Sequence, residues 1–165
     1  MLCIRYSKII FLSAVALYVT LVAFGNVTDY QTNFEFVKHV MSMDSIFPDS
    51  TITYRALINP NIHHIAYFLI IAMEMVIAAA GWYGAYVMFC ARGCSSRQFN
   101  YSKKWGVIAL TLGFILWQVG FMSVGGEWFG MWMSKDWNGV NASSRVFMML
   151  IAVQIYLALP DGEVL

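Results

Sequence analysis

The sequence predicts an all-α membrane protein: a bundle of four transmembrane helices with an interfacial amphipathic helix in its first outer loop. Two observations carry this prediction. The 165 residues are 60% hydrophobic and only 12% charged, with a mean hydropathy of +0.65, whereas soluble domains carry roughly a quarter charged residues. In addition, four apolar runs reach or approach the ~20 residues that a helix needs to cross the hydrocarbon core of a bilayer. A net charge of +1 argues against a nucleic-acid partner.

The four runs are expected to form one membrane domain over residues 1–165. Backbone groups inside a bilayer find no water, so each run must be helical. The first run follows a short basic leader, but its apolar core of about 17 residues exceeds the ~7–15 of a signal peptide, which favours a retained helix. The predicted spans are 9–25, 62–91, 105–124 and 142–160, joined by outer loops 26–60 and 125–141 and by a cytoplasmic loop, 92–104.

Basic residues indicate the orientation of these spans. Lys and Arg concentrate in the cytoplasmic loops of membrane proteins. Six of the ten basic residues lie at the N-terminus or in and beside the 92–104 loop, so we expect both termini in the cytoplasm. All three cysteines fall on this reducing side, where no disulfide is expected.

The first outer loop contains the amphipathic helix, which the pattern predicts over about residues 33–46. Thr32 and Glu35 have the spacing of a capping box at a helix N-terminus, and apolar residues recur at helical spacing after them. Lys38 and His39 fall on the opposite face. This arrangement is typical of a helix that lies in the membrane interface.

Three short signals indicate helix ends. Asn59 is a good N-cap and Pro60 suits the first helical position, so the second long helix is expected to begin there. The third span can continue past a bend at Gly125–Gly126 and protrude as far as Trp137. Asn138–Gly139 would then end that helix.

Three of the spans each carry one polar side chain in mid-run: Glu74, Gln118 and Gln154. An ionisable group in a membrane helix costs roughly 2.5–3.5 kcal/mol on insertion scales, so it normally faces other helices. Counted inward from the outer helix ends, the three lie within about 5 Å in height at ~1.5 Å per residue. We therefore predict one intramembrane polar layer. It either locks helix packing, which is the commoner role, or forms a proton or substrate site.

The outer segments also hold histidines and methionines. Thioethers with imidazoles suit copper, especially Cu(I), but methionine is ordinary core filler. No close pair of His or Cys ligands fixes a coordination geometry. We predict no cofactor, and regard His63, His64, Met131 and Met133 as weak candidates for a copper site. His63 and His64 are weaker candidates still for haem.

Residues 125–139, GGEWFGMWMSKDWNG, mark the outer end of the third span. Tryptophans concentrate at the membrane–water boundary, so the stretch is expected to be mainly an anchor. We expect Glu127 to pair with Lys135, Lys38 or His63. An outer-face interaction role is assigned to seven residues: Glu127, Trp128, Trp132, Lys135, Asp136, His39 and Asp44.

The sequence resembles a bacterial family of predicted small integral membrane proteins that is classified only as a domain of unknown function. The resemblance rests on NFEFVKHVMSMD, residues 33–44, and on residues 125–139. It extends over nearly the full length. It implies a multi-pass protein of the bacterial inner membrane with four helices. It brings no reaction, cofactor or catalytic residue.

No catalytic motif stands out. The chain has no Gly-rich phosphate loop, no G-x-S-x-G and no H-E-x-x-H, so we name no catalytic residue and do not expect an enzyme. The leading hypothesis is an accessory or interaction subunit of an inner-membrane assembly, whose partners are the lipid bilayer and either another membrane protein or a second copy. The alternative is a small transporter or ligand-binding protein centred on Glu74, Gln118 and Gln154.

Overall fold

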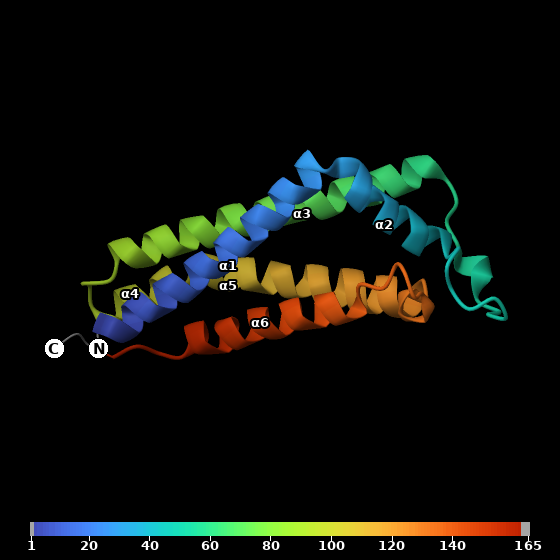
Figure 1. Ribbon diagram of the computed structural model, residues 1–165. Coiled ribbons are helices and arrows are strands. Elements are labelled where there is room, and N and C mark those ends of the chain that lie inside the picture. The colour runs from blue at the N-terminus through green and yellow to red at the C-terminus, as the bar shows by residue number, and fades with distance from the viewer. Residues whose placement is uncertain (1, 163–165) are drawn as a thin grey trace.

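The computed structural model describes residues 2–162, and within that range every regular element is helical. Four helical segments are long and apolar enough to cross a membrane, which confirms the predicted all-α membrane fold. They lie alongside one another, with the start of the first and the end of the last at the same end of the molecule (Figure 1). These segments are α1 (Leu2–Thr28), α3 (Pro60–Cys90), the run Ser96–Trp128 and α6 (Val140–Ala158).

The run Ser96–Trp128 contains three helices. Two are α-helices, α4 (Ser96–Ser102) and α5 (Lys104–Phe114), and the third, η2 (Ile115–Trp128), is a π-helix of 14 residues. Its end is marked by a bond of the i→i+5 type, from the amide of Phe129 to the carbonyl of Val124 at 3.0 Å. π-helices mostly occur as single turns and are frequent at functional sites. A long π-helix within a membrane span therefore indicates that a functional site lies near it.

The second long helix begins where the sequence predicts. Pro60 is its first residue, and the Asn59 side chain caps it by accepting the amide of Asn61 at 3.0 Å. Pro60 lacks an amide hydrogen that would be unbonded at this position in any case.

The third span ends earlier than the continuation to Trp137 that we expected. Helix η2 passes through both of its final glycines without interruption and ends at Trp128. Gly130 then adopts a left-handed φ of 65°, a conformation that glycine enters at little cost. After the short helix η3 (Met131–Met133), Asn138 accepts the amide of Val140 at 3.1 Å. Asn138 therefore lies two residues before α6, whose N-cap is Gly139, and it does not end the third span.

The amphipathic helix is present as α2 (Tyr30–Ser42), but the predicted capping box is wrong. The helix starts directly after Asp29, so Thr32 lies inside its first turn. The Glu35 carboxylate accepts hydrogen bonds from Lys38 and Gln31, both at 2.7 Å. The apolar face of α2 packs on the first half of α3, which follows Pro60. A loop that contains η1 (Thr53–Arg55) returns the chain to α3.

Small residues let the long helices approach closely over the half of the molecule that holds the termini. A Cβ added to Gly81 would lie 3.0 Å from the Cβ of Ala16 on α1, and one added to Gly84 would lie 2.6 Å from the backbone nitrogen of Gly106 on α5. Toward the other end α3 and η2 diverge, and α2 lies across the opening (Figure 1).

Candidate functional site

A buried carboxylate marks the place where α1, α2 and α3 meet. Glu74 on α3 is only 1% exposed. The Asn26 side chain, near the end of α1, donates a 2.8 Å hydrogen bond from Nδ2 to Oε2 of Glu74. The hydroxyl of Tyr67, two helical turns before Glu74, donates to the carbonyl of Asn26 at 3.0 Å. The end of α1 is thus fixed against the polar face of α3.

These groups line a small cavity of about 170 Å³, which we call the polar chamber. Its lining residues with polar side-chain atoms are Asn26, Asn33, Tyr67, Glu74 and Trp117. Two oxygens there make no hydrogen bond within residues 2–162, Oε1 of Glu74 and Oδ1 of Asn33; the Asn33 amide instead donates to the carbonyl of Asp29 at 3.1 Å. The unbonded oxygens are acceptors, so the chamber suits a group that donates hydrogen bonds.

A second cavity of about 280 Å³ lies beside the first, and we call it the apolar chamber. It is bounded by α2, α3, η2 and the segment that holds Phe129 and Met131, and almost all of its lining atoms are apolar. Both chambers share Phe36, Val37, Ile70 and Phe121 as lining residues, so the two cavities adjoin at these side chains.

The π-helix shapes the wall of the apolar chamber. Three pairs of its lining residues are separated by five positions, which is the spacing that the i→i+5 pattern of η2 brings to one face. Gly120 leaves space in this wall, because a Cβ there would meet only Leu116 of the same segment, at 3.8 Å. The three pairs are Leu116–Phe121, Gly120–Gly125 and Val124–Phe129.

The structure does not bring together the three residues of the expected polar layer. Glu74 bonds to Asn26, and the Gln154 amide donates to the hydroxyl of Thr111 at 3.0 Å. The Gln118 side chain makes no hydrogen bond in the described part of the chain and lines neither chamber. The partner of Glu74 comes from α1, which the sequence pattern left out because Asn26 follows the apolar run.

The outer-face residues fall into two groups. In the first, each side chain has an aromatic or charged neighbour. Nδ1 of His39 lies 2.7 Å from Oδ2 of Asp44, and the His39 ring stacks on Trp137 at 4.4 Å. The other two members, Trp128 and Trp132, contact Arg55 at 4.8 Å and Phe47 at 5.8 Å.

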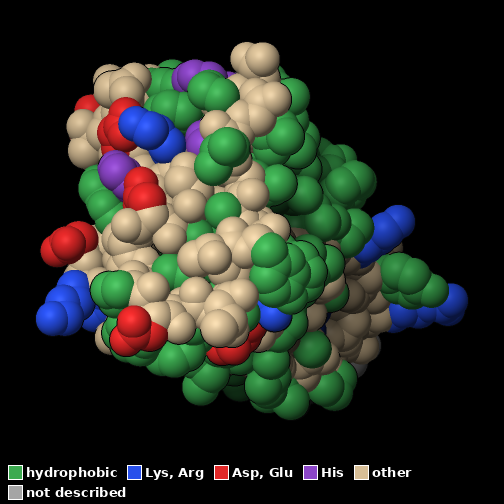
Figure 2. Space-filling view, turned by 90° about the vertical axis from the view of Figure 1, so that its right-hand side faces the viewer, with side chains coloured by type: hydrophobic (Ala, Val, Ile, Leu, Met, Phe, Trp, Pro, Cys, Tyr) green, Lys and Arg blue, Asp and Glu red, His purple; other side chains and the backbone are tan. Residues whose placement is uncertain are grey.

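The second group, Glu127, Lys135 and Asp136, is exposed and forms no ion pair within residues 2–162. The expected pairing of Glu127 with Lys135, Lys38 or His63 is not formed among the described residues: Lys38 pairs with Glu35 on its own helix, and Nε2 of His63 bonds to the carbonyl of Leu57. Figure 2 looks onto this end of the molecule, where acidic, basic and histidine side chains lie among apolar ones.

The weak metal candidates do not converge. Nε2 of His63 donates to the carbonyl of Leu57, and Nδ1 of His64 lies 2.8 Å from the hydroxyl of Tyr30. The sulfur of Met131 is buried against Gly125 and Gly139. The side chain of Met133 lies against Gly130. Over the described residues, no three His, Cys, Asp or Glu side chains are grouped to hold a metal ion.

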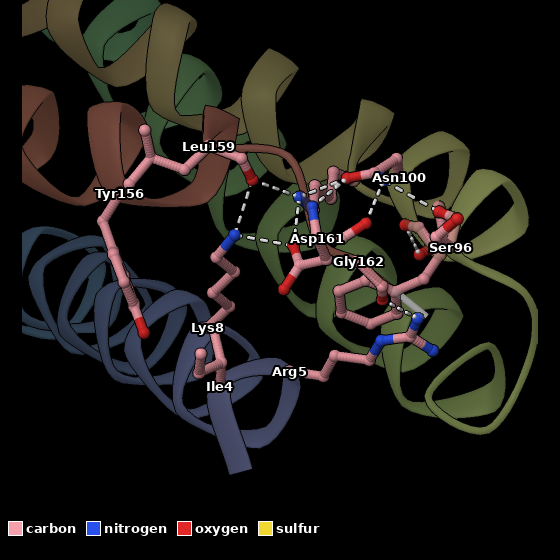
Figure 3. Close-up of polar contacts among 12 residues, drawn as sticks. Ile4, Arg5, Lys8, Ser96, Asn100, Tyr156, Leu159, Asp161 and Gly162 are labelled. Carbon is pink, nitrogen blue, oxygen red and sulfur yellow. Dashed lines mark hydrogen bonds and ion pairs between the residues drawn. The ribbon is translucent and has the colours of Figure 1, made fainter. Parts of the chain in front are cut away.

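A buried set of charges at the end that holds the termini was not foreseen. It consists of Arg5, Lys8, Lys103 and Asp161, none more than 7% exposed, and we call it the basic cluster (Figure 3). Oδ2 of Asp161 accepts from Lys8 at 2.6 Å and from Lys103 at 2.5 Å. Both lysines also donate to the carbonyl of Leu159, at 2.6 and 2.7 Å.

Arg5 connects the cluster to the chain around it. Its guanidinium donates to the carbonyls of Arg92, Cys94 and Gly162 at 2.9, 2.6 and 2.9 Å, and lies over the Phe99 ring at 4.6 Å. The start of α1 is thus tied to the α3–α4 loop and to the segment after α6. A signal was available, since Arg5 and Lys8 are three residues apart and share one helical face.

The fold and the buried polar groups define a helical integral membrane protein. The chain belongs to the family of predicted small integral membrane proteins named DUF2165, whose family model matches residues 4–160 and which is a domain of unknown function. This match confirms the resemblance seen in residues 33–44 and 125–139. No curated protein and no solved structure matches the chain.

Proposed function

We propose that this protein binds a lipophilic molecule whose head group donates a hydrogen bond, with the head group in the polar chamber and the apolar part in the apolar chamber. The observation that carries the proposal is Glu74, a carboxylate at membrane depth with one hydrogen-bond partner and one oxygen left open to a cavity. A purely structural carboxylate would be expected to have both oxygens bonded, because burying an unsatisfied polar group is costly.

The shape of the two chambers supports an amphiphilic ligand. Small-molecule sites are mostly apolar with a few polar groups that set orientation, and typically measure ~300–1,000 Å³. The acceptors Glu74 and Asn33 lie at one end, and the wall made by η2 is apolar throughout. An amine or hydroxyl on a hydrocarbon body fits this division, and it can enter from the bilayer.

The test is to identify what the protein carries. Wild-type protein would be purified from its own membranes in mild detergent and examined by native mass spectrometry, with extraction of bound small molecules. We expect a lipophilic amine or alcohol that is lost in Gly120→Leu, whose side chain enters the apolar chamber. Gly25→Leu is the control, since a Cβ at Gly25 meets nothing within 4 Å and the residue lines neither chamber. Retention of the molecule by Gly120→Leu would contradict the proposal.

A second function, an accessory subunit that binds another membrane protein or a second copy, draws support from the outer face. Glu127, Lys135 and Asp136 are exposed there and form no ion pair among the described residues, and the ring of Trp128 is exposed as well. Exposed aromatic groups within a charged rim are typical of interaction surfaces. Co-purification of one stoichiometric partner, lost when Trp128 and Lys135 are both changed to Ala, is the expected result.

We further propose that the end with the basic cluster faces the cytoplasm of a bacterium and that the outer face lies beyond the inner membrane. Six basic residues lie at the former end against one acidic residue, Asp161, within residues 2–162. This excess agrees with the bias of cytoplasmic segments toward Lys and Arg.

A further inference from the structure

A groove between the start of α5 and the end of α6 lies directly beside the basic cluster. It has a volume of about 630 Å³, and Lys103 and Asn100 belong to its lining as well as to the polar contacts around Asp161. Its polar rim also includes Tyr101 and Lys104, both exposed. We call it the α5–α6 groove.

The groove is divided into a polar and an apolar part. Lys104 precedes Val107 and Ile108 by three and four positions, so these side chains share one face of α5, with the charge at the helix end. Opposite them, Ala158 and Pro160 at the end of α6 continue the apolar wall. A molecule that fits this groove has a polar head at the end of the bilayer and a hydrocarbon part along the helices.

The charge around the groove determines which head group fits. The basic cluster buries three cationic side chains against one carboxylate. Lys103 has no capacity left, because its three ammonium hydrogens are taken by Asn100, Leu159 and Asp161. Lys104 is exposed and has no ion pair within residues 2–162. An anion in the groove would meet the Lys104 ammonium and the Tyr101 hydroxyl, and would balance the excess positive charge behind them.

We propose that the α5–α6 groove binds an anionic phospholipid of the surrounding leaflet, with its phosphate at Lys104 and Tyr101 and an acyl chain against Val107 and Ile108. Basic pockets between membrane helices on the cytoplasmic side recognise such head groups. This site is separate from the two chambers, and neither Glu74 nor η2 contributes to it.

The test uses full-length protein that has been delipidated in a neutral detergent. Phosphatidylglycerol and phosphatidylcholine with identical acyl chains are added separately, and the bound fraction is measured by native mass spectrometry. We expect phosphatidylglycerol to bind more tightly, and Lys104→Gln to weaken it about fivefold, as for one lysine near an anionic lipid surface. Arg97→Gln is the matched control, because Arg97 is an exposed basic residue of neighbouring α4 that does not line the groove.

Three results would overturn the proposal. The first is equal binding of the two lipids. The second is unchanged phosphatidylglycerol binding by Lys104→Gln, which is a surface substitution with no buried contact to lose. The third is an equal bound fraction of inorganic phosphate at the same concentration, which would show that the acyl chain and the apolar wall contribute nothing to binding. Ile108→Trp tests the contribution of the apolar wall. The larger side chain fills the groove, so phosphatidylglycerol binding is expected to weaken although Lys104 is unchanged.

Discussion

The ammonium of Lys8 lies 2.6 Å from the carboxylate of Asp161, and both side chains are almost completely buried. The two residues are 153 positions apart, so this contact joins the first helix to the segment that follows the last one. Lys103 reaches the same oxygen from the start of α5. One carboxylate therefore holds together three parts of the chain that the sequence keeps apart.

Replacing Asp161 with Asn is expected to destabilise the protein strongly. Two buried ammonium groups would lose the one carboxylate that they contact within residues 2–162, and breaking a buried ion pair from one side typically costs about 3–5 kcal/mol. Thermal unfolding in detergent, followed by circular dichroism, measures the change. Asp49→Asn is the control, because Asp49 is exposed and takes part in no ion pair within residues 2–162. Equal stability of the two variants would show that the cluster does not hold the termini.

The same contact predicts a dependence on pH. Burial raises the pKa of the Asp161 carboxyl, but hydrogen bonds from Lys103 and Lys8 outweigh burial, so its pKa lies below the ordinary value of 3.8. A carboxyl with a lowered pKa stabilises the fold above its unfolded-state pKa and loses that contribution as pH falls through its folded-state pKa. The difference in unfolding temperature between wild type and Asp161→Asn should therefore be constant near neutral pH and shrink below about pH 4. A constant difference down to pH 2 would argue against this role.

The sequence predicts the long helices well because their signal is local. A run of apolar residues, an Asn-Pro start and a basic flank each act through neighbouring positions, and the helix that starts at Pro60 shows this. The end of the third span was harder. Gly130 ends it through a left-handed turn, and nothing in the residue order separates this glycine from Gly125, which continues the helix.

The candidate site was predicted only in part, since its geometry is not local. The sequence indicates Glu74 because an ionisable side chain in a membrane helix is energetically costly. Its partner Asn26 comes from another helix and follows the apolar run of that helix, so it does not stand out as a mid-span polar group. The π-helical bonding of η2 has no sequence signal that we can name. It changes which residues share a face, so Gln118 could not be placed by α-helical counting.

The contact between α3 and α5 gives a prediction about packing. In Gly84→Ala the new Cβ would lie 2.6 Å from the backbone nitrogen of Gly106, so one helix must move. We expect a loss of at least about 1–3 kcal/mol in the free energy of unfolding, as for overpacked cores. Gly25→Ala adds the same methyl group in open space and should be neutral or stabilising. Thermal unfolding in detergent compares the two variants. Equal unfolding temperatures would mean that α3 and α5 can separate enough to accommodate the methyl group.

Changing Glu74 to Gln separates ligand binding from folding. The glutamine retains an oxygen that accepts from Asn26, so the unfolding temperature should change little. The amide nitrogen that replaces Oε1 cannot accept a hydrogen bond from the ligand, and leaving a buried donor unpaired costs about 1–3 kcal/mol, so the ligand affinity should fall about fivefold or more. Gln118→Leu is the control, because the Gln118 side chain lines neither chamber. Native mass spectrometry measures the bound ligand in both variants, and thermal unfolding in detergent measures their stability. An unchanged ligand signal in Glu74→Gln would remove the carboxylate from the proposed site.

The native cysteines test which end of the molecule faces the cytoplasm. Cys3, Cys90 and Cys94 are all exposed, and Cys94 lies in the α3–α4 loop, whose backbone is held by Arg5. A maleimide that cannot cross membranes should therefore label wild-type protein in inverted inner-membrane vesicles and leave it unlabelled in intact spheroplasts. Asp49→Cys in a background without the native cysteines places a thiol in the exposed loop before α3, and it should show the opposite pattern. If the native cysteines react in spheroplasts, the orientation is reversed, and the anionic lipid proposed for the α5–α6 groove would have to come from the outer leaflet.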